Sequence, residues 1–122
     1  MPEPELPLLD DGALAELAAS VGGDSAFVLD LIDTYLGDAP RQIAEIQAAA
    51  DAHDAASLIR PAHTLKSSSA TVGAQRLAAR ARRLEIAGRE DALDGAADDL
   101  AGLAAEWEAT LQALRAWRDR EA

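Results

Sequence analysis

The chain has no cysteine, one lysine, and few aromatic residues (two Trp, one Tyr and one Phe). Without cysteine it has no disulfides, thiolate metal sites or thiol nucleophiles. A net charge of −11 argues against nucleic-acid binding, which needs a broad basic surface. No run approaches the ~20 apolar residues of a membrane span, and the acidic start lacks the basic region of a secretion signal. These absences predict a cytoplasmic protein that binds neither nucleic acid nor a membrane.

Apolar residues are nevertheless abundant. They make up 49% of the chain, many of them alanine, while aromatics make up 3%. This composition favours closely packed helices over a sheet, and 122 residues are enough for one core. We therefore expect a single all-α domain over residues 11–122, preceded by an extended, proline-rich lead-in over residues 1–10.

Helical spacing and helix breakers divide the domain into five expected helices. Four of them begin after a capping Asp or Ser or an acidic run, the fourth in order begins after a glycine, and glycines or changes of pattern separate them. The expected helices are a short one over about Gly12–Val21 capped by Asp10 or Asp11 and ended by Gly22 and Gly23, a second from Asp24 or Ser25 to about Ala50, a third capped by Asp54, a fourth after Gly73, and a fifth after the acids from Glu90 onward.

Two prolines interrupt these patterns. Pro40 lies inside the second expected helix, where its missing N–H predicts a kink or a restart near Asp38. Pro61 would cost about 3 kcal/mol inside the third helix, so that helix should bend there or begin later than Asp54. His53, between these helices, is more typical of a turn residue than of a ligand.

The last segment has a seven-residue repeat of apolar side chains. One series is Leu93, Leu100, Trp107 and Leu114, and the series between them is Ala96, Leu103, Thr110 and Trp117. This spacing is typical of the seam of a left-handed helix bundle. We expect a monomeric, antiparallel, up-down four-helix bundle with a short extra N-terminal helix.

The stretch from Ala55 to Leu84 contains no Asp or Glu but six Lys or Arg residues. A cationic surface on an acidic body indicates an anionic target, such as a phosphoryl group or a carboxylate-rich partner. Within it, Lys66 and Ser67 follow His63 at helical spacings of three and four, so they share a face with it. The apolar residues lie on another stripe, which predicts that His63 points outward.

Residues 62–78, AHTLKSSSATVGAQRLA, resemble the signature of histidine phosphotransfer (HPt) domains. That signature is His-x-x-Lys-Gly-Ser-Ser, followed by a glycine and another helix. The resemblance implies that His63 is the phosphoacceptor and Lys66 the cation that stabilises the phosphoryl group, with Ser68 and Ser69 as the serine pair. Ser67 stands where the family most often has glycine. It also implies a partner-binding surface comprising Arg60, Ser67, Ala70, Gln75 and Arg76.

The resemblance further implies a phosphorelay carrier. Its His63 would accept a phosphoryl group from an aspartyl phosphate and pass it on, between receiver domains of a hybrid sensor histidine kinase or of response regulators. Imidazole suits this role because one ring nitrogen is a free base at neutral pH. The chain lacks a phosphate-binding G-x-x-x-x-G-K loop, so we expect no kinase activity and no cofactor, with Mg²⁺ only in the partner receiver.

Three alternatives remain open at this point. A helical metalloprotein is disfavoured because the chain has no Glu-x-x-His motif. A non-catalytic interaction module, with His63 merely a surface residue, is disfavoured by the position of the sole lysine one turn from it. The third is the phosphoacceptor domain of a chemotaxis-type kinase, although the short chain beginning at Met1 favours a free-standing carrier.

Overall fold

The computed structural model describes residues 6–20, 22 and 25–121, with Asp11 and Ser25 described by their backbone alone. All regular elements in these residues are helical, which confirms the all-α prediction. The elements are α1 (Asp11–Ser20), α2 (Ser25–Asp51), α3 (Ala55–Thr71), α4 (Gln75–Arg89), the short 3-10 helix η1 (Leu93–Ala96) and α5 (Ala97–Glu121).

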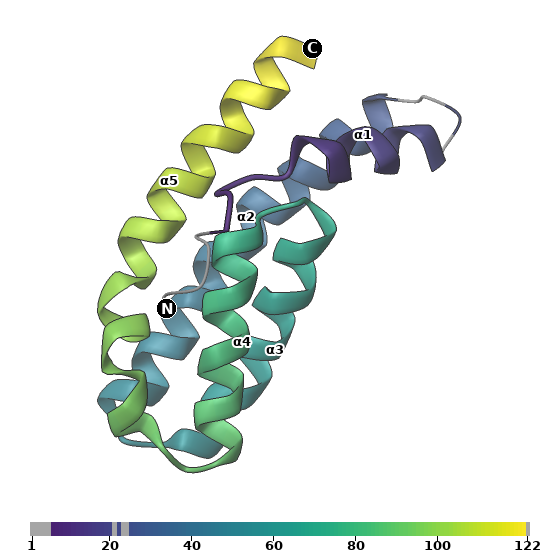
Figure 1. The fold of residues 1–122 in the computed structure, drawn as a ribbon. Helices are drawn as coiled ribbons and strands as arrows, with labels where there is room; N and C mark the ends of the chain where they lie inside the picture. The colour runs from purple at the N-terminus through teal and green to yellow at the C-terminus, as the bar shows by residue number, and fades with distance from the viewer. Residues whose placement is uncertain (1–5, 21, 23–24, 122) are drawn as a thin grey trace.

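The four long helices run side by side in alternating directions, and α1 lies across one end of them (Figure 1). The hairpin of α3 and α4 has the most extensive contact, α2 packs on α3, and α5 packs on both α2 and α4. The C-terminal end of α5 projects beyond the turn between α3 and α4 (Figure 1). The predicted up-down bundle with an extra N-terminal helix is thus confirmed.

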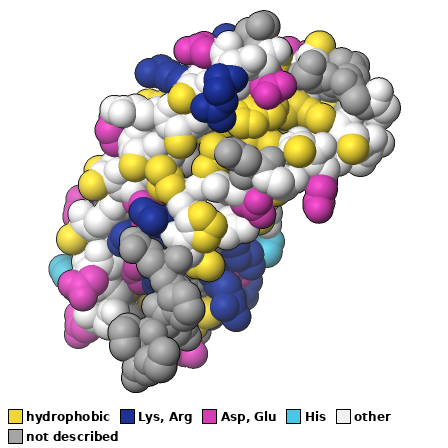
Figure 2. All heavy atoms as spheres, turned by 45° about the horizontal axis from the view of Figure 1, so that its top comes forward, with side chains coloured by type: hydrophobic (Ala, Val, Ile, Leu, Met, Phe, Trp, Pro, Cys, Tyr) yellow, Lys and Arg dark blue, Asp and Glu magenta, His cyan; other side chains and the backbone are white. Residues whose placement is uncertain are grey.

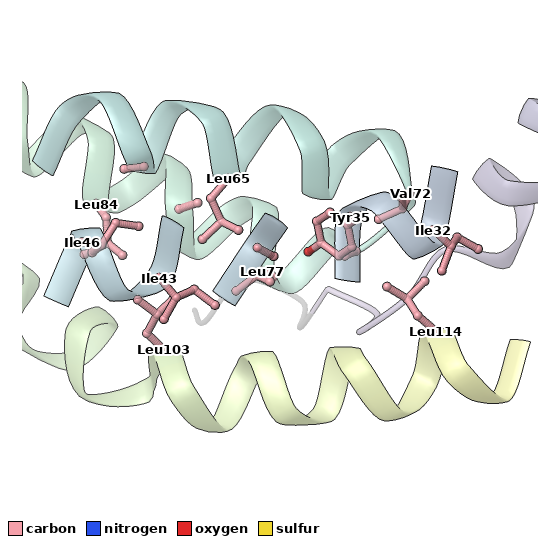
Figure 3. Packing of buried hydrophobic residues seen from close by; sticks show 14 of the residues in the cluster. Ile32, Tyr35, Ile43, Ile46, Leu65, Val72, Leu77, Leu84, Leu103 and Leu114 are labelled. Atoms are coloured by element: carbon pink, nitrogen blue, oxygen red, sulfur yellow. The ribbon is translucent and has the colours of Figure 1, made fainter. Parts of the chain in front are cut away.

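The core lies along the axis of the bundle, where side chains from all four long helices converge (Figure 3). Fully buried members include Ile32 and Ile46 from α2, Leu58 and Leu65 from α3, Leu77 and Leu84 from α4, and Leu103 and Leu114 from α5. The predicted seven-residue seam of α5 therefore faces the core. One aromatic contact strengthens it, because the rings of Tyr35 and Trp107 meet edge to face with centroids 5.7 Å apart.

Two aspartates cap helices as the sequence predicts. Asp10 Oδ1 accepts hydrogen bonds from the amides of Gly12 (2.9 Å) and Ala13 (3.2 Å) at the start of α1. Asp54 Oδ1 accepts one from the amide of Ser57 (3.1 Å) at the start of α3. These bonds satisfy donors that have no partner inside the helix. The predictions for Gly23, Asp24 and the side chains of Asp11 and Ser25 lie outside the described residues, as do residues 1–5 of the expected lead-in.

The turns also follow the sequence. His53 has φ 52°, which agrees with its interpretation as a turn residue. Gly73, with φ 76°, joins α3 to α4 at a close approach: a Cβ there would lie 2.7 Å from the carbonyl oxygen of Asp10. Glycine therefore both reverses the chain and leaves space for the lead-in.

At each proline the structure excludes one of the two expected outcomes. Helix α2 continues through Pro40 without a restart, and α3 begins directly after its cap, so Pro61 lies inside it and a late start is wrong. The packing of α2 and α3 outweighs their local proline costs. In the described part of the chain, no helix is long and apolar enough to cross a membrane.

Candidate functional site

His63 lies near the middle of α3 and points away from the core. Its side chain is 54% exposed, whereas its neighbours Ala62 and Leu65 are fully buried. The helical period separates the two faces, because residues one before and two after a given position lie on a different side of the helix. The outward orientation predicted for His63 is confirmed.

Across from His63, α4 supplies Glu85, whose side chain is only 7% exposed. Its Oε2 lies 3.1 Å from Nδ1 of His63. Lys66 Nζ lies 2.7 Å from Oε1, and Arg89 Nη2 donates to Oε2 at 2.9 Å. One buried carboxylate thus holds the ring and two cations at the surface between α3 and α4. We call these four residues the Glu85 cluster.

The surroundings of Glu85 determine its charge. Its hydrogen bond with Lys66, followed by those with Arg89 and His63, lowers its pKa to about 2 against the opposing effect of desolvation. The carboxylate is therefore ionised at neutral pH and can only accept hydrogen bonds. Nδ1 of His63 must then carry the hydrogen, which leaves the lone pair of the neutral ring on Nε2. Nε2 has no hydrogen-bond partner among the described residues.

A glycine brings α3 and α4 close enough for this arrangement. Gly88, one turn after Glu85, is buried where the helices meet. A Cβ on it would lie 2.9 Å from Cγ1 of Ile59 and 3.0 Å from the carbonyl oxygen of Ala55. Because side chains essentially never approach so closely, a larger residue would push the helices apart and lengthen the contacts of Glu85.

Beneath the outward face of α3, a side-chain hydrogen bond joins this helix to α2. The hydroxyl groups of Ser69 and Tyr35 are buried and 2.7 Å apart. Burial raises the pKa of Tyr35, so this phenol stays protonated and can donate or accept. Ser69 therefore acts in the core, as its place on the predicted buried stripe indicates, and fixes the helix that carries His63.

The predicted partner-binding residues fall into two groups. Arg60, Ser67 and Ala70 are all exposed on α3, within two turns of His63. Their spacings of three, four and seven residues place them on its face of the helix. The structure therefore brings these three together with the ring.

Gln75 and Arg76 lie elsewhere, at the start of α4. Gln75 Nε2 donates to Asp10 Oδ2 at 2.9 Å, and Arg76 Nε donates to the carbonyl oxygen of Leu6. Both side chains thus bind the lead-in at the α3–α4 turn. Because α3 and α4 are antiparallel, this turn lies more than two helical turns from His63.

The cationic stretch does not form one surface. Nη1 of Arg80 lies 3.4 Å from Oδ1 of Asp99, and its Nη2 lies 3.4 Å from Oε1 of Glu106. Nη2 of Arg83 lies 2.8 Å from Oδ1 of Asp99. These two arginines point to α5, where acids neutralise them. In the view of Figure 2, one of the two histidines lies beside a group of Lys and Arg side chains at the edge of the molecule.

A groove of about 250 Å³ runs between α2 and α3 beside the site. Its lining is mostly uncharged and comprises Leu31, Thr34, Tyr35, Asp38, Gln42, Thr64, Ser68, Thr71 and Val72. Thr64 follows His63 directly in α3, so the groove lies around the helix from the face that carries the ring. No group of three acids or histidines in the described part of the chain could hold a metal ion.

Sequence reasoning missed Glu85 and Arg89. The available signal was the end of the acid-free stretch, because Glu85 is the first acid after it and stands four residues before Arg89. That spacing predicts an ion pair on one helix but not the contact with His63, which is 22 residues away in the chain.

Comparison with known proteins agrees with this geometry. The family model of the Hpt domain matches residues 30–117, most of the chain. The chain belongs to the Hpt family. Its fold is similar to the crystal structure of histidine-containing phosphotransfer protein B (HptB) from Pseudomonas aeruginosa PAO1, with a TM-score of 0.84, 28% identity, and coverage of 95% of this chain and 98% of that one. A search of curated proteins found no match.

Membership of the Hpt family assigns the chain a general role. Hpt proteins are histidine phosphotransfer carriers of phosphorelays that interact with receiver domains, and they are not kinases. The resemblance of residues 62–78 to the Hpt signature is therefore confirmed.

Proposed function

We propose that this carrier accepts a phosphoryl group on His63 from a receiver aspartyl phosphate and passes it to another response-regulator receiver. The observation that carries the proposal is the orientation of the ring. A half-exposed imidazole is held through Nδ1 by the buried Glu85, so the nucleophilic Nε2 is available to a partner.

The chemistry needs no proton transfer at the attacking atom. The lone pair of Nε2 attacks phosphorus, the bond from phosphorus to the aspartyl oxygen breaks, and its electron pair leaves on the carboxylate. Negative charge is spread over the phosphoryl oxygens in this step, so nearby cations lower its barrier. Lys66 and Arg89 are both exposed enough to approach those oxygens, at 31% and 59%.

The receiver would cover the outward face of α3. Arg60 supplies positive charge there, while Ser67 and Ala70 are small enough for close approach. The adjoining groove between α2 and α3 could take apolar side chains of the receiver. A receiver that also reached Gln75 and Arg76 would contact the lead-in, so their partner-binding role stays a prediction.

We further propose that the carrier has no cofactor of its own and that Mg²⁺ acts in the receiver, at the aspartyl phosphate. Its partners would be the receiver of a hybrid sensor histidine kinase, a response regulator, or both. A cytoplasmic location and a monomeric state stay predictions of the sequence.

Label transfer from a phosphorylated receiver tests the proposal. The parent chain should become labelled, and the denatured product should lose the label in acid and keep it in base, as a phosphoramidate does. His63→Gln should abolish labelling without changing helicity or the unfolding midpoint.

His53→Asn is the matched control. It removes the other histidine, and asparagine tolerates the positive φ of that turn. This variant should label like the parent. Labelling that survives in His63→Gln, or disappears only in His53→Asn, would refute the assignment.

A further inference from the structure

The hydrogen on Nδ1 of His63 becomes important once phosphorus is bonded to Nε2. The bond uses the Nε2 lone pair, so a ring that still carries hydrogen on Nδ1 is a cation. An imidazolium ring can release its proton to water near neutral pH. The phosphorylated ring therefore has two possible states, one cationic and one neutral.

Glu85 lies where it favours the cationic state. Its Oε2 is 3.1 Å from Nδ1, and its side chain is almost completely buried. A negative charge at this distance stabilises a positive ring, and the interaction is stronger at a partly dehydrated site than in water. The two cations on Glu85 also hold the carboxylate in position.

We propose that Glu85 keeps the phosphorylated ring of His63 protonated on Nδ1 and thereby makes it a better phosphoryl donor. This inference rests on the proposed function, because it concerns the step that follows phosphorylation of His63. Glu85 acts here as a positioning residue, since it contacts the ring and not the phosphoryl group.

The leaving group in the transfer from phosphorylated His63 to the next receiver explains why a protonated ring is the better donor. A carboxylate oxygen of the next receiver attacks phosphorus, the bond from phosphorus to Nε2 breaks, and its electron pair returns to Nε2. If Nδ1 has kept its hydrogen, the leaving group is neutral imidazole. If that hydrogen has been lost, the leaving group is an imidazolate anion, a much stronger base and a poorer leaving group.

Other charged groups lie on the helix that carries the ring and on the two helices packed against it. They are Arg60 and Lys66 on α3, Arg82 and Arg89 on α4, and Asp38 on α2, which lines the groove and pairs with Arg41. The cations nearest the ring oppose its positive charge. The phosphoryl group attracts Lys66 and Arg89, however, so any shift of these cations toward it leaves more of the charge of Glu85 to the ring.

Glu85→Gln isolates the charge, because glutamine keeps the size of the side chain and an oxygen that accepts from Nδ1. Glu106→Gln is the matched control, since it makes the same change in the contact of α5 with Arg80. All three proteins are phosphorylated with phosphoramidate, which requires no receiver. After the donor is removed, the loss of phosphoryl to water and its transfer to an unphosphorylated receiver with Mg²⁺ are timed at several pH values.

At pH 8, we expect the phosphoryl group on Glu85→Gln to live at least tenfold longer than on the parent and to move to the receiver at least tenfold more slowly. At pH 5.5 the proteins should converge, because solvent then protonates the ring in all of them. Glu106→Gln should follow the parent at every pH. A merely structural role for Glu85 would not produce this convergence.

A second readout needs no variant. The ¹⁵N spectrum of the phosphorylated parent at pH 8 should show hydrogen on Nδ1. A ring without that hydrogen, or equal lifetimes of the parent and Glu85→Gln at all pH values, overturns the inference while leaving His63 as the carrier residue. If neither phosphoramidate nor a phosphorylated receiver labels His63, the proposed function fails and this inference fails with it.

Discussion

Helix α4 carries two charged clusters that face different neighbours. The Glu85 cluster faces α3, and the second cluster, formed by Arg80, Arg83, Asp99 and Glu106, faces α5. The first buries an acid beneath cations and a histidine ring, whereas in the second an arginine and two acids are buried to a similar extent. We call the second group the Arg80 cluster.

The side chains of the two clusters differ in how much of them is exposed to solvent, and this difference suits the clusters to different roles. In the Arg80 cluster, the side chains of Arg80, Asp99 and Glu106 are each less than one-fifth exposed, so only Arg83 is open to solvent. In the Glu85 cluster, only the acid is buried and its partners reach the surface. Similar ion pairs can therefore join helices in one place and present a reactive ring in another. The following predictions test this contrast.

The largest expected effect is on stability, from Arg80→Ala. This change leaves Asp99 and Glu106 partly buried with less compensation, and we expect a loss of about 2 to 3 kcal/mol in the free energy of unfolding. Phosphorylation of His63 should not change. Urea unfolding measures the loss, and Arg83→Ala, whose side chain is more exposed, should cost under about 1 kcal/mol. Equal losses in the two variants would contradict the structural role of the buried arginine.

The next effect is on rate. Lys66→Ala removes a charged contact with the transferred group, worth about 1.5 to 3 kcal/mol, so phosphorylation should slow about 10- to 100-fold. Because Lys66 is near the surface, the fold should lose only about 1 kcal/mol. Rapid-quench kinetics with a phosphorylated receiver measures the rate. Arg83→Ala, the same loss of charge on the α5 side, should transfer at the parent rate. Similar slowing in both would mean that only overall charge matters.

Acid should weaken the Glu85 cluster. The pKa of Glu85 is lowered from 4.5 to about 2, so its stabilisation is complete above pH 4.5 and is lost as the pH falls from there toward 2. After allowance for solvent screening, we expect about 1 to 2 kcal/mol from this residue. Urea unfolding from pH 6 to 2.5 should show a steeper loss in the parent than in Glu85→Gln. Parallel curves would mean that the ion pairs of Glu85 do not stabilise the fold.

The smallest effect is expected from Ser67→Gly, at the position where the chain differs from the usual glycine of the family. Ser67→Gly should cost up to about 1 kcal/mol, because glycine is entropically unfavourable inside a helix, and transfer should be unchanged or slightly faster. Ser67→Glu should keep the bundle folded but block the receiver by size and charge. Thermal unfolding and transfer rates should be measured together on the parent and both variants. Transfer by Ser67→Glu at the parent rate would remove Ser67 from the docking surface.

The sequence predicted the features that depend on residues near one another in the chain. Helical spacing placed the buried stripe of α3 and the outward His63, and seven-residue spacing placed the seam of α5. Capping at Asp54 and the turn at Gly73 also follow from nearby residues. The two prolines show the limit of this reasoning, because burial in the bundle outweighs a local cost that a single helix would show as a break.

The contacts that depend on how the helices pair could not be predicted from the sequence. Glu85 meets His63 only because α3 and α4 pack in one particular register, with Gly88 allowing close approach. The arginines of the acid-free stretch likewise divide between neighbours, since Arg80 and Arg83 meet acids of α5. A run of like charges in the sequence therefore gave no indication of which cations surround the ring.

We expect Glu85 to hold His63 through Nδ1 and to leave Nε2 as the phosphoryl acceptor. The most direct test is to label the histidines with ¹⁵N, phosphorylate the chain with a receiver, and identify the nitrogen bonded to phosphorus from the ³¹P–¹⁵N coupling. We expect a single phosphorylated site, Nε2 of His63. Phosphorus on Nδ1 of His63, the nitrogen that faces Glu85, or on either nitrogen of His53, would contradict it.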